Sequence, residues 1–197
     1  MKQFIYILYT LCLSVFCNNA LADVVKLPGN IAVHIAKTHY EHPVRLLHPY
    51  LDIWHLKGPM AEKVALKALE KRFANTHLCN ETSNADVVLL LEPHMYYNPQ
   101  LRVFHGEFIA RAYTNSTATD KMPEPITTIK KQAQQNGELG IKPDFYMEKA
   151  YAKAMDKVIN KLETDKAFLD TLKATSKGNA ETLCPALDDL PVAKIFY

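Results

Sequence analysis

The sequence predicts an α+β fold in which two helices pack on one face of a single small mixed or antiparallel sheet. Three observations lead to this prediction. Runs of β-branched residues at a period of two indicate strands, two longer segments rich in Ala, Leu, Glu and Lys indicate amphipathic helices, and the elements follow one another in the order β-α-β-β-α. Two helices on the same face of one sheet would bury both apolar stripes together.

The first strand and the first helix are expected within residues 30–73. Alternating β-branched side chains predict a half-buried strand over residues 30–39, namely those of Ile31, Val33 and Ile35. Residues 40–57 contain two prolines but are too apolar for a free loop, which favours short strand or turn pieces packed on the core. A helix is expected over residues 60–73, because Pro59 stands at a first-turn position where a missing N–H has no partner to lose.

A β-hairpin is expected between residues 85 and 113. The apolar run Val87–Leu91 predicts a central strand covered on both faces, although Pro93 limits how far that strand can stay inside a ladder. A turn is expected over Tyr96–Gln100, followed by a second strand from Leu101 to about Tyr113. One face of this strand would hold Phe104, Phe108, Ala110 and Ala112, and the other would hold Val103, His105, Glu107, Ile109 and Arg111.

A polar segment, a long helix and a C-terminal tail complete the expected domain. Residues 115–142 contain two prolines and two glycines and are expected to form a mobile or functional loop, with residues 126–135 as a candidate for a short helix or strand inside it. The longest helix is expected from Pro143 to about Thr164, with a continuation or second piece to Leu172. The tail, residues 175–197, ends on three apolar residues, which predicts that it is ordered and held against the body.

Residues 1–22 have the three parts of a cleavable signal peptide: a positive charge at Lys2, an apolar run over residues 4–16, and small residues at the cleavage site Ala20-Leu21-Ala22. As a helix the apolar run would span only about 20 Å, less than the roughly 30 Å of a bilayer core. We therefore expect residues 23–197 to be a single periplasmic or secreted domain with no membrane span. The alternative is a lipid anchor at Cys17, although Phe16 stands where lipoprotein signals place Gly or Ala.

The charge balance discounts two classes of partner. Loss of Lys2 with the leader leaves 22 basic and 21 acidic residues, and the two signs are interspersed along the chain. Nucleic-acid-binding proteins and proteins that bind anionic membranes concentrate positive charge on one surface. We therefore expect neither nucleic acid nor an anionic membrane surface as a partner.

Cleavage of the leader would also leave only two of the four cysteines, Cys79 and Cys184. An even number of cysteines in an oxidising compartment favours a disulfide between them. The closed loop of about 105 residues would stabilise the fold by roughly 4–5 kcal/mol in the chain-entropy model. The alternatives are two free buried thiols or a reactive pair, and the latter has no CxxC spacing to support it.

Familiar catalytic and nucleotide-binding motifs do not occur in the sequence. It contains no G-x-S-x-G, no H-E-x-x-H, no S-x-x-K, no G-x-G-x-x-G and no P-loop. The chain is therefore expected to be non-catalytic and to use no cofactor. The remaining enzymatic alternative is a hydrolase built on His105 and Glu107, which stand two residues apart on one face of a strand.

The histidines offer a metal-binding alternative. Five of the eight lie between residues 34 and 55, and the candidate ligands of a transition metal are His39, His42 and His48. Their spacing does not match the usual zinc patterns, and an acidic partner at helical spacing is missing. The competing interpretation is a set of imidazoles at the surface or at an interface.

The hairpin 85–113 followed by the helix 151–162 resembles, in outline, small exported α/β proteins of the bacterial envelope that assist transport or assembly machines. A likeness of fold carries no function by itself. The leading hypothesis is a non-catalytic accessory protein of the envelope that binds a protein partner through its hairpin tip and open sheet face. The contact residues would be Tyr96, Tyr97, His105, Glu107 and Arg111. The alternative is a metal- or small-ligand-binding protein that uses residues 34–55.

Intact mass spectrometry of the exported protein tests the leader and the disulfide together. We expect a chain that begins at Asp23 and whose mass is about 2 Da below that of the reduced form, because the disulfide removes two hydrogens. Equal masses before and after reduction would contradict the disulfide. An added acyl mass on a chain that begins at Cys17 would establish the lipid anchor instead.

Overall fold

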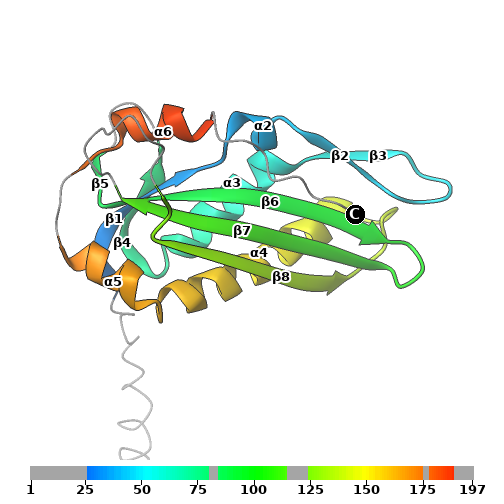
Figure 1. Ribbon diagram of the computed structural model, residues 1–197. Helices are drawn as coiled ribbons and strands as arrows, with labels where there is room; N and C mark the ends of the chain where they lie inside the picture. Colours follow the sequence, from blue (N-terminus) through cyan, green and yellow to red (C-terminus); the bar gives the residue numbers. More distant parts are fainter. Residues whose placement is uncertain (1–25, 80–83, 115–123, 175–177, 189–197) are drawn as a thin grey trace, which may run out of the picture.

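The computed structural model describes residues 26–79, 84–114, 124–174 and 178–188, and its main element is a five-stranded sheet in the order β4-β1-β6-β7-β8 (Figure 1). The strands are β1 (Leu27–His34), β4 (Phe73–Leu78), β6 (Val87–Asn98), β7 (Val103–Thr114) and β8 (Thr127–Asn136). Strand β1 runs parallel to β4 and β6, whereas β6, β7 and β8 are successively antiparallel. The predicted α+β fold with one mixed sheet is confirmed.

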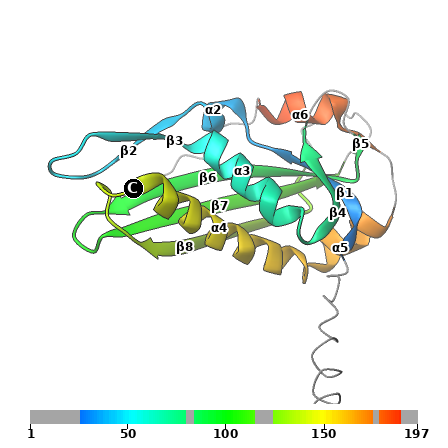
Figure 2. The ribbon, with the colours of Figure 1, turned by 180° about the vertical axis from the view of Figure 1, so that it is seen from behind.

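Two helices lie together behind this sheet, as predicted. They are α3 (Lys57–Leu69) and α4 (Pro143–Leu162), and Figure 2 shows them from behind, side by side across the strands. The main core lies between helices and sheet, and its fully buried side chains include Ile31, Leu69, Leu89, Leu91, Phe104, Phe108, Tyr151 and Val158. The short helix α5 (Lys166–Lys173) adds Phe168 to the same core.

A second, smaller core lies on the opposite face of the sheet, under α6 (Ala180–Asp188). Its buried residues are Ala32, Ala36, Ala85, Val88, Leu90, Tyr113, Leu183, Cys184 and Leu187. Cys79 and Cys184 lie at disulfide distance, with their Cα atoms 6.1 Å apart. Asp188 Oδ1 pairs with His34 Nε2 at 3.1 Å and accepts the backbone N–H of Lys37 at 2.9 Å, so the end of α6 is tied to the end of β1. Lys37 begins the short helix α2 (Lys37–Tyr40).

Within the segment 115–142 that was predicted to be a loop, residues 127–136 form the edge strand β8, so of the helix and the strand considered for residues 126–135 the strand is correct. The side chains of Ile129 and Ala133 are buried against α4, while every alternate residue of this strand is exposed. An edge strand with one solvated face needs only this much apolar surface. Its composition therefore looked like that of a loop.

The first helix begins and ends earlier than predicted. Helix α3 ends at Leu69, and Phe73, which was expected to be helical, begins β4 beside β1. Phe73 is fully buried, and its ring meets that of Phe168 edge-on with 6.0 Å between centroids. Burial of this ring in the core outweighs the weak helical propensity of the residues around it.

Two further differences concern prolines. Strand β6 continues through Pro93 to Asn98, so that the predicted turn lies later, at residues 99–102. Strand β1 pairs with β6 only as far as Leu90, and beyond that point a missing N–H can face the side without a partner strand. The predicted strand over residues 30–39 ends earlier, at His34, and residues 37–39 belong to α2 instead.

Residues 41–57 contain a separate hairpin of β2 (Pro43–Leu46) and β3 (Ile53–Leu56), consistent with the short pieces expected there.

Several predictions fall outside the described residues. They concern the leader 1–22 with Cys17, the segment 115–123, and parts of the tail, 175–177 and 189–197. Within the tail, β9 (Gly178–Asn179) pairs with β5 (Asn84–Ala85), and α6 follows it.

Helix α4 packs closely on strand β7 at Gly106. A Cβ atom at Gly106 on β7 would lie 2.8 Å from the backbone carbon of Ala150 and 2.9 Å from the nitrogen of Tyr151, both in α4. Since backbone atoms of a packed helix cannot give way, we expect Gly106→Ala to lower the free energy of unfolding by about 2–3 kcal/mol in urea titrations.

Gly140→Ala is the matched control, because its Cβ would meet nothing nearer than Leu51 Cδ1 at 3.4 Å. We expect a change within about 0.5 kcal/mol. Equal effects of the two substitutions would contradict the close packing of α4 on β7.

Candidate functional site

The face of the sheet opposite α3 and α4 carries a row of polar side chains, and it holds four of the five predicted contact residues. Tyr96 on β6 pairs with His105 on β7, and His94 pairs with Glu107. Arg111 lies further along β7 on the same face, opposite Leu90. The alternation predicted for β7 is therefore confirmed, and we call this surface the open face.

The charged side chains of the open face form ion pairs with one another or with β8. The guanidinium of Arg111 pairs with the carboxylate of Glu92, which is 5 % exposed. Lys130 of β8 pairs with Glu107 at 3.2 Å between Nζ and Oε1. Loss of one partner from a buried pair leaves an uncompensated charge and is strongly destabilising. Arg111 and Glu92 are therefore bound to one another rather than free to meet a partner.

Besides Arg111, the basic side chains of His39 and Lys57 lie close enough to Glu92 to feel its charge. The His39 ring meets the ring of His94 edge-on at 6.0 Å between centroids. Burial lowers the pKa of His94 to about 4, and the positive charge of Lys57 acts in the same direction. Burial likewise lowers the pKa values of His39 and Lys57, partly offset by the charge of Glu92. An imidazole with so low a pKa is neutral at pH 7, so His94 adds no positive charge there.

The two tyrosines of the hairpin point to opposite sides. Tyr96 stacks on His105 with 4.1 Å between ring centroids and an interplanar angle of 11°, and its hydroxyl accepts a hydrogen bond from Gln132 Nε2 at 2.9 Å. Tyr97 is buried on the helix side, where its ring packs on that of Phe104. The structure therefore separates the pair of tyrosines that was predicted to form one contact patch.

His105 and Glu107 make contacts with different residues. The Nδ1 atom of His105 lies 3.4 Å from Gln134 Nε2, and Glu107 pairs with Lys130. A general base needs its ring oriented by an acid or by a carbonyl within hydrogen-bond reach. Among the described residues this pair does not have that arrangement.

The candidate metal ligands are not assembled. In the described ranges, groups of three or more His, Cys, Asp or Glu side chains that could hold a metal ion are absent. His39 is buried beside His94, His42 is exposed, and His48 accepts the backbone N–H of Tyr50 at Nδ1. The prediction of a metal site on His39, His42 and His48 is therefore not supported by the geometry.

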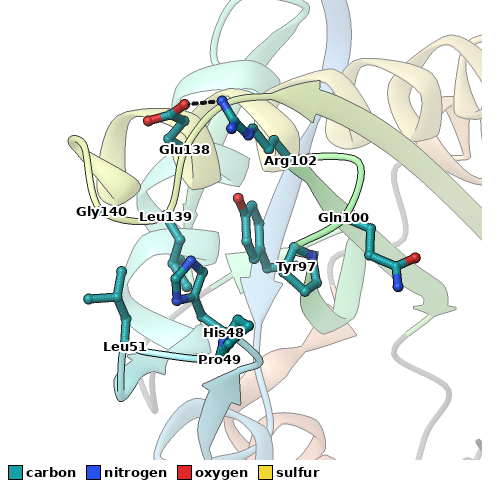
Figure 3. A pocket seen from close by; sticks show the side chains of 10 residues that line it. His48, Pro49, Leu51, Tyr97, Gln100, Arg102, Glu138, Leu139 and Gly140 are labelled. Atoms are coloured by element: carbon teal, nitrogen blue, oxygen red, sulfur yellow. Dashed lines mark hydrogen bonds and ion pairs between the residues drawn. The ribbon is translucent and has the colours of Figure 1, made fainter.

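A groove that the sequence did not indicate lies at one end of the molecule (Figure 3). Its volume is about 460 Å³, and it lies between the β2–β3 loop, the β6–β7 turn and the loop from β8 to α4. Tyr97 stands in the middle of the lining with Leu139 beside it, and the ion pair between Arg102 and Glu138 closes one rim (Figure 3). Residues 47–51, 99–102 and 137–142 are thus brought together from three separate parts of the chain.

The same three loops and the first turn of α4 expose large apolar side chains, which we call the loop-tip surface. Their exposed fractions are Tyr50 91 %, Leu101 69 %, Leu47 66 %, Ile141 56 % and Phe145 50 %. Arg102 and Lys142 in these loops are the two non-glycine residues with positive φ in the described chain, at 53° and 48°. Backbone of this kind costs energy and concentrates at functional sites. Leu47 and Tyr50 flank His48-Pro49 in the sequence. This short apolar stretch beside a proline is the only part of the surface that the sequence could have indicated.

Comparison with known proteins gives a likeness of fold. No family model and no curated protein matches the chain. A crystal structure from Xanthomonas campestris, of a protein in the family DUF330, shares 12 % identity at a TM-score of 0.50 over 80 % of this chain and 92 % of that one. A "putative lipoprotein" from Caulobacter crescentus shares 12 % identity at a TM-score of 0.36, over 70 % of this chain and 87 % of that one, which is too low to support an argument. The first of these likenesses shows a shared fold and nothing further.

A separate observation concerns the membrane: in the described chain no helix is long and apolar enough to cross a bilayer.

Two buried histidines should make stability depend on pH. Burial lowers the pKa of both His55 and His94 to about 4, from an ordinary value near 6.5. Protons bind these rings more tightly in the unfolded chain than in the folded one. The contribution of the neutral rings to the free energy of unfolding is therefore fully present above pH 6.5 and is lost as the pH falls toward 4. When the pH is lowered from 7 to 5, each ring should reduce the free energy of unfolding by about 2 kcal/mol.

Urea titrations of His55→Gln and His94→Gln at both pH values measure this contribution. Each variant should lose less stability on acidification than the parent, by about 2 kcal/mol. His42→Gln, at an exposed position, should behave as the parent does. A pH dependence unchanged in all three variants would show that neither ring is buried in its neutral form.

Proposed function

We propose that the mature chain is an exported, non-catalytic protein of the bacterial cell envelope that binds a protein partner through the loop-tip surface. One observation supports this above all: three loops distant in sequence line one open groove, and these loops together with the first turn of α4 expose five large apolar side chains. Exposed aliphatic and aromatic groups that cluster on a folded protein are typical of interaction sites.

The chemistry of this surface suits a protein partner. Tyr50 and Phe145 are rigid aromatic groups that bury much area for little loss of side-chain entropy. Charged pairs stand at the edge, Arg45 with Asp52 at 2.8 Å and Arg102 with Glu138. An apolar centre with a polar rim is the usual anatomy of a protein–protein interface.

The open face is the weaker candidate for this contact. Its carboxylates are paired within the sheet, and His94, His105 and Glu92 are all more than nine-tenths buried. A partner at this face would have to break a buried ion pair, at a cost of several kcal/mol. The three loops, which include the tip of the β6–β7 hairpin, are therefore the better candidate for the contact than the open face.

A second candidate is a small ligand in the groove itself. The volume of about 460 Å³ is in the range of small-molecule sites, and Tyr97, Leu139 and Leu51 give it an apolar lining. His48 also lines it, so this alternative keeps part of the histidine-rich segment 34–55.

Site-specific photocrosslinking in the native envelope tests the proposal. A benzophenone amino acid in place of Tyr50 or Leu101 should give one discrete protein adduct, whereas the same probe at Lys166 should give none. Lys166 is an exposed residue of α5, at the opposite end of the molecule (Figure 1).

With the crosslinked partner purified, Tyr50→Ala should weaken its affinity by about tenfold or more, as for a central aromatic contact. The melting temperature should not change, since the side chain is 91 % exposed. Equal adducts at Tyr50 and Lys166 would contradict the proposal, and so would no adduct at any position.

A further inference from the structure

Strand β8 forms one free edge of the described sheet, next to the long helix α4 (Figure 2). Its ten residues, Thr127–Asn136, pair with β7 in an unbroken register, and none of them is a proline. An edge of this length presents a row of backbone N–H and C=O groups with which another extended chain can pair. Folded proteins block such edges by local means, and for β8 the structure shows which means is used.

Three successive outward carbonyls of β8 accept hydrogen bonds from side chains. In an antiparallel pair, alternate residues turn their backbone groups toward the neighbouring strand and away from it. The outward carbonyl of Gln132 accepts from Lys157 Nζ at 2.9 Å, and that of Gln134 accepts from Lys153 Nζ at 3.4 Å. A third carbonyl, that of Asn136, accepts from the side-chain amide of the residue before it at 2.8 Å. The acceptors along this half of the edge are therefore occupied.

The two lysines belong to a row on α4 whose spacing matches that of the strand. Lysines follow one another at four-residue steps along this helix: Lys149, Lys153, Lys157 and Lys161. Four residues of a helix advance about 6 Å, and two residues of a strand advance about 7 Å. Successive turns of α4 can therefore supply one ammonium group to each outward carbonyl. The order of the two bonds shows that α4 runs opposite to β8.

These ammonium groups stand where the donors of an added strand would have to lie. An added strand pairs by donating its own N–H groups to the outward carbonyls, so it competes with Lys153 and Lys157 for the same acceptors. Both lysines are exposed in the described molecule. Strand addition would either displace their ammonium groups or bury them at the new junction without a carboxylate, which is unfavourable.

The composition of β8 indicates which strand would pair there if the edge were open. Four of its last five residues carry amide side chains, namely Gln132, Gln134, Gln135 and Asn136. Rows of Gln and Asn side chains stabilise the stacking of identical strands, because each amide can bond to its copy in the next strand. A second copy of this chain is therefore the occupant that fits an open β8 edge.

We propose that Lys153 and Lys157 close the β8 edge to strand addition and so prevent two copies of this chain from pairing edge to edge. The block is a row of cations on the helix beside the strand, in place of a proline or a bulge within it. This inference is independent of the loop-tip surface, since either can hold without the other.

Removal of the two ammonium groups from the mature protein tests this closure. Methionine keeps the unbranched stem and the helical propensity of lysine but has no donor. In Lys153→Met/Lys157→Met we expect the dissociation constant for self-association to fall at least about tenfold below that of the parent. Sedimentation equilibrium at physiological ionic strength, where exposed charges are largely screened, measures this constant.

Hydrogen–deuterium exchange locates the contact in the associated variant. Backbone amides of residues 127–136 should exchange more slowly than in the parent, because the outward N–H groups gain partners.

Three further variants separate the hydrogen bonds to the edge from the loss of charge. Lys67→Met/Lys71→Met removes the same charge from exposed positions at α3 and should change the dissociation constant less than about twofold. Lys153→Arg/Lys157→Arg keeps a cationic donor at both positions and should behave as the parent does. Adding Gln132→Pro to the methionine pair on α4 should reverse the association, because a proline at an outward position blocks the edge without removing a bond to β7.

Parent-like behaviour of the methionine pair on α4 would overturn the proposal. Equal association of both methionine pairs would overturn it too, since loss of charge would then be the cause. Protection that appears only outside residues 127–136 would place the contact elsewhere and have the same consequence. If the double substitution prevents folding, Lys157→Met alone applies the same test, with a smaller shift expected. None of these variants alters Tyr50 or Leu101, so failure here leaves the proposed partner site untouched.

Discussion

The structure depends on the ladder between β6 and β7. Twelve residue pairs run in register from Val87 and Thr114 to Asn98 and Val103. Because side chains alternate along a strand, this single register assigns Phe104 and Phe108 to the helix side and Glu92 and Arg111 to the other. A slip by one residue would bury the charged set under α4 and expose the aromatic set. Its length also takes the β6–β7 turn to the end of the molecule where the other two loops meet it (Figure 1).

Much of this arrangement could be predicted from the sequence. The uninterrupted apolar run of β6 and the alternation of β7 identify the hairpin, and the apolar steps of α4 identify the long helix. The signals of the two edge strands are weak. Strand β8 buries only Ile129 and Ala133, so the sequence left a short helix and a strand open there. Strand β4 was missed, because it follows α3 without a glycine or proline between them. In both cases pairing with a neighbouring strand, which a local pattern does not encode, decides the conformation.

The candidate site shows the same division. Sequence alternation placed His105, Glu107 and Arg111 on one face, but it could not show that Glu107 and Arg111 pair with Lys130 and Glu92. Nor could it bring residues 47–51, 99–102 and 137–142 together, since that depends on how three loops end at the same edge of the fold. Exposure of Tyr50 and Leu101 is likewise a property of the assembled molecule. The functional argument therefore rests on the tertiary structure rather than on any motif.

The buried ion pair of Glu92 and Arg111 lies on the open face, whereas Tyr50 and Leu101 are exposed on the loops at one end of the molecule. The most direct test of a contact at the loops is hydrogen–deuterium exchange of the mature protein, alone and bound to its partner. The account predicts slowed exchange of the backbone amides in residues 47–51, 99–102 and 137–142 on binding, with β8 unchanged. Protection that falls instead on the exposed edge strand β8, with the three loops unaffected, would contradict it.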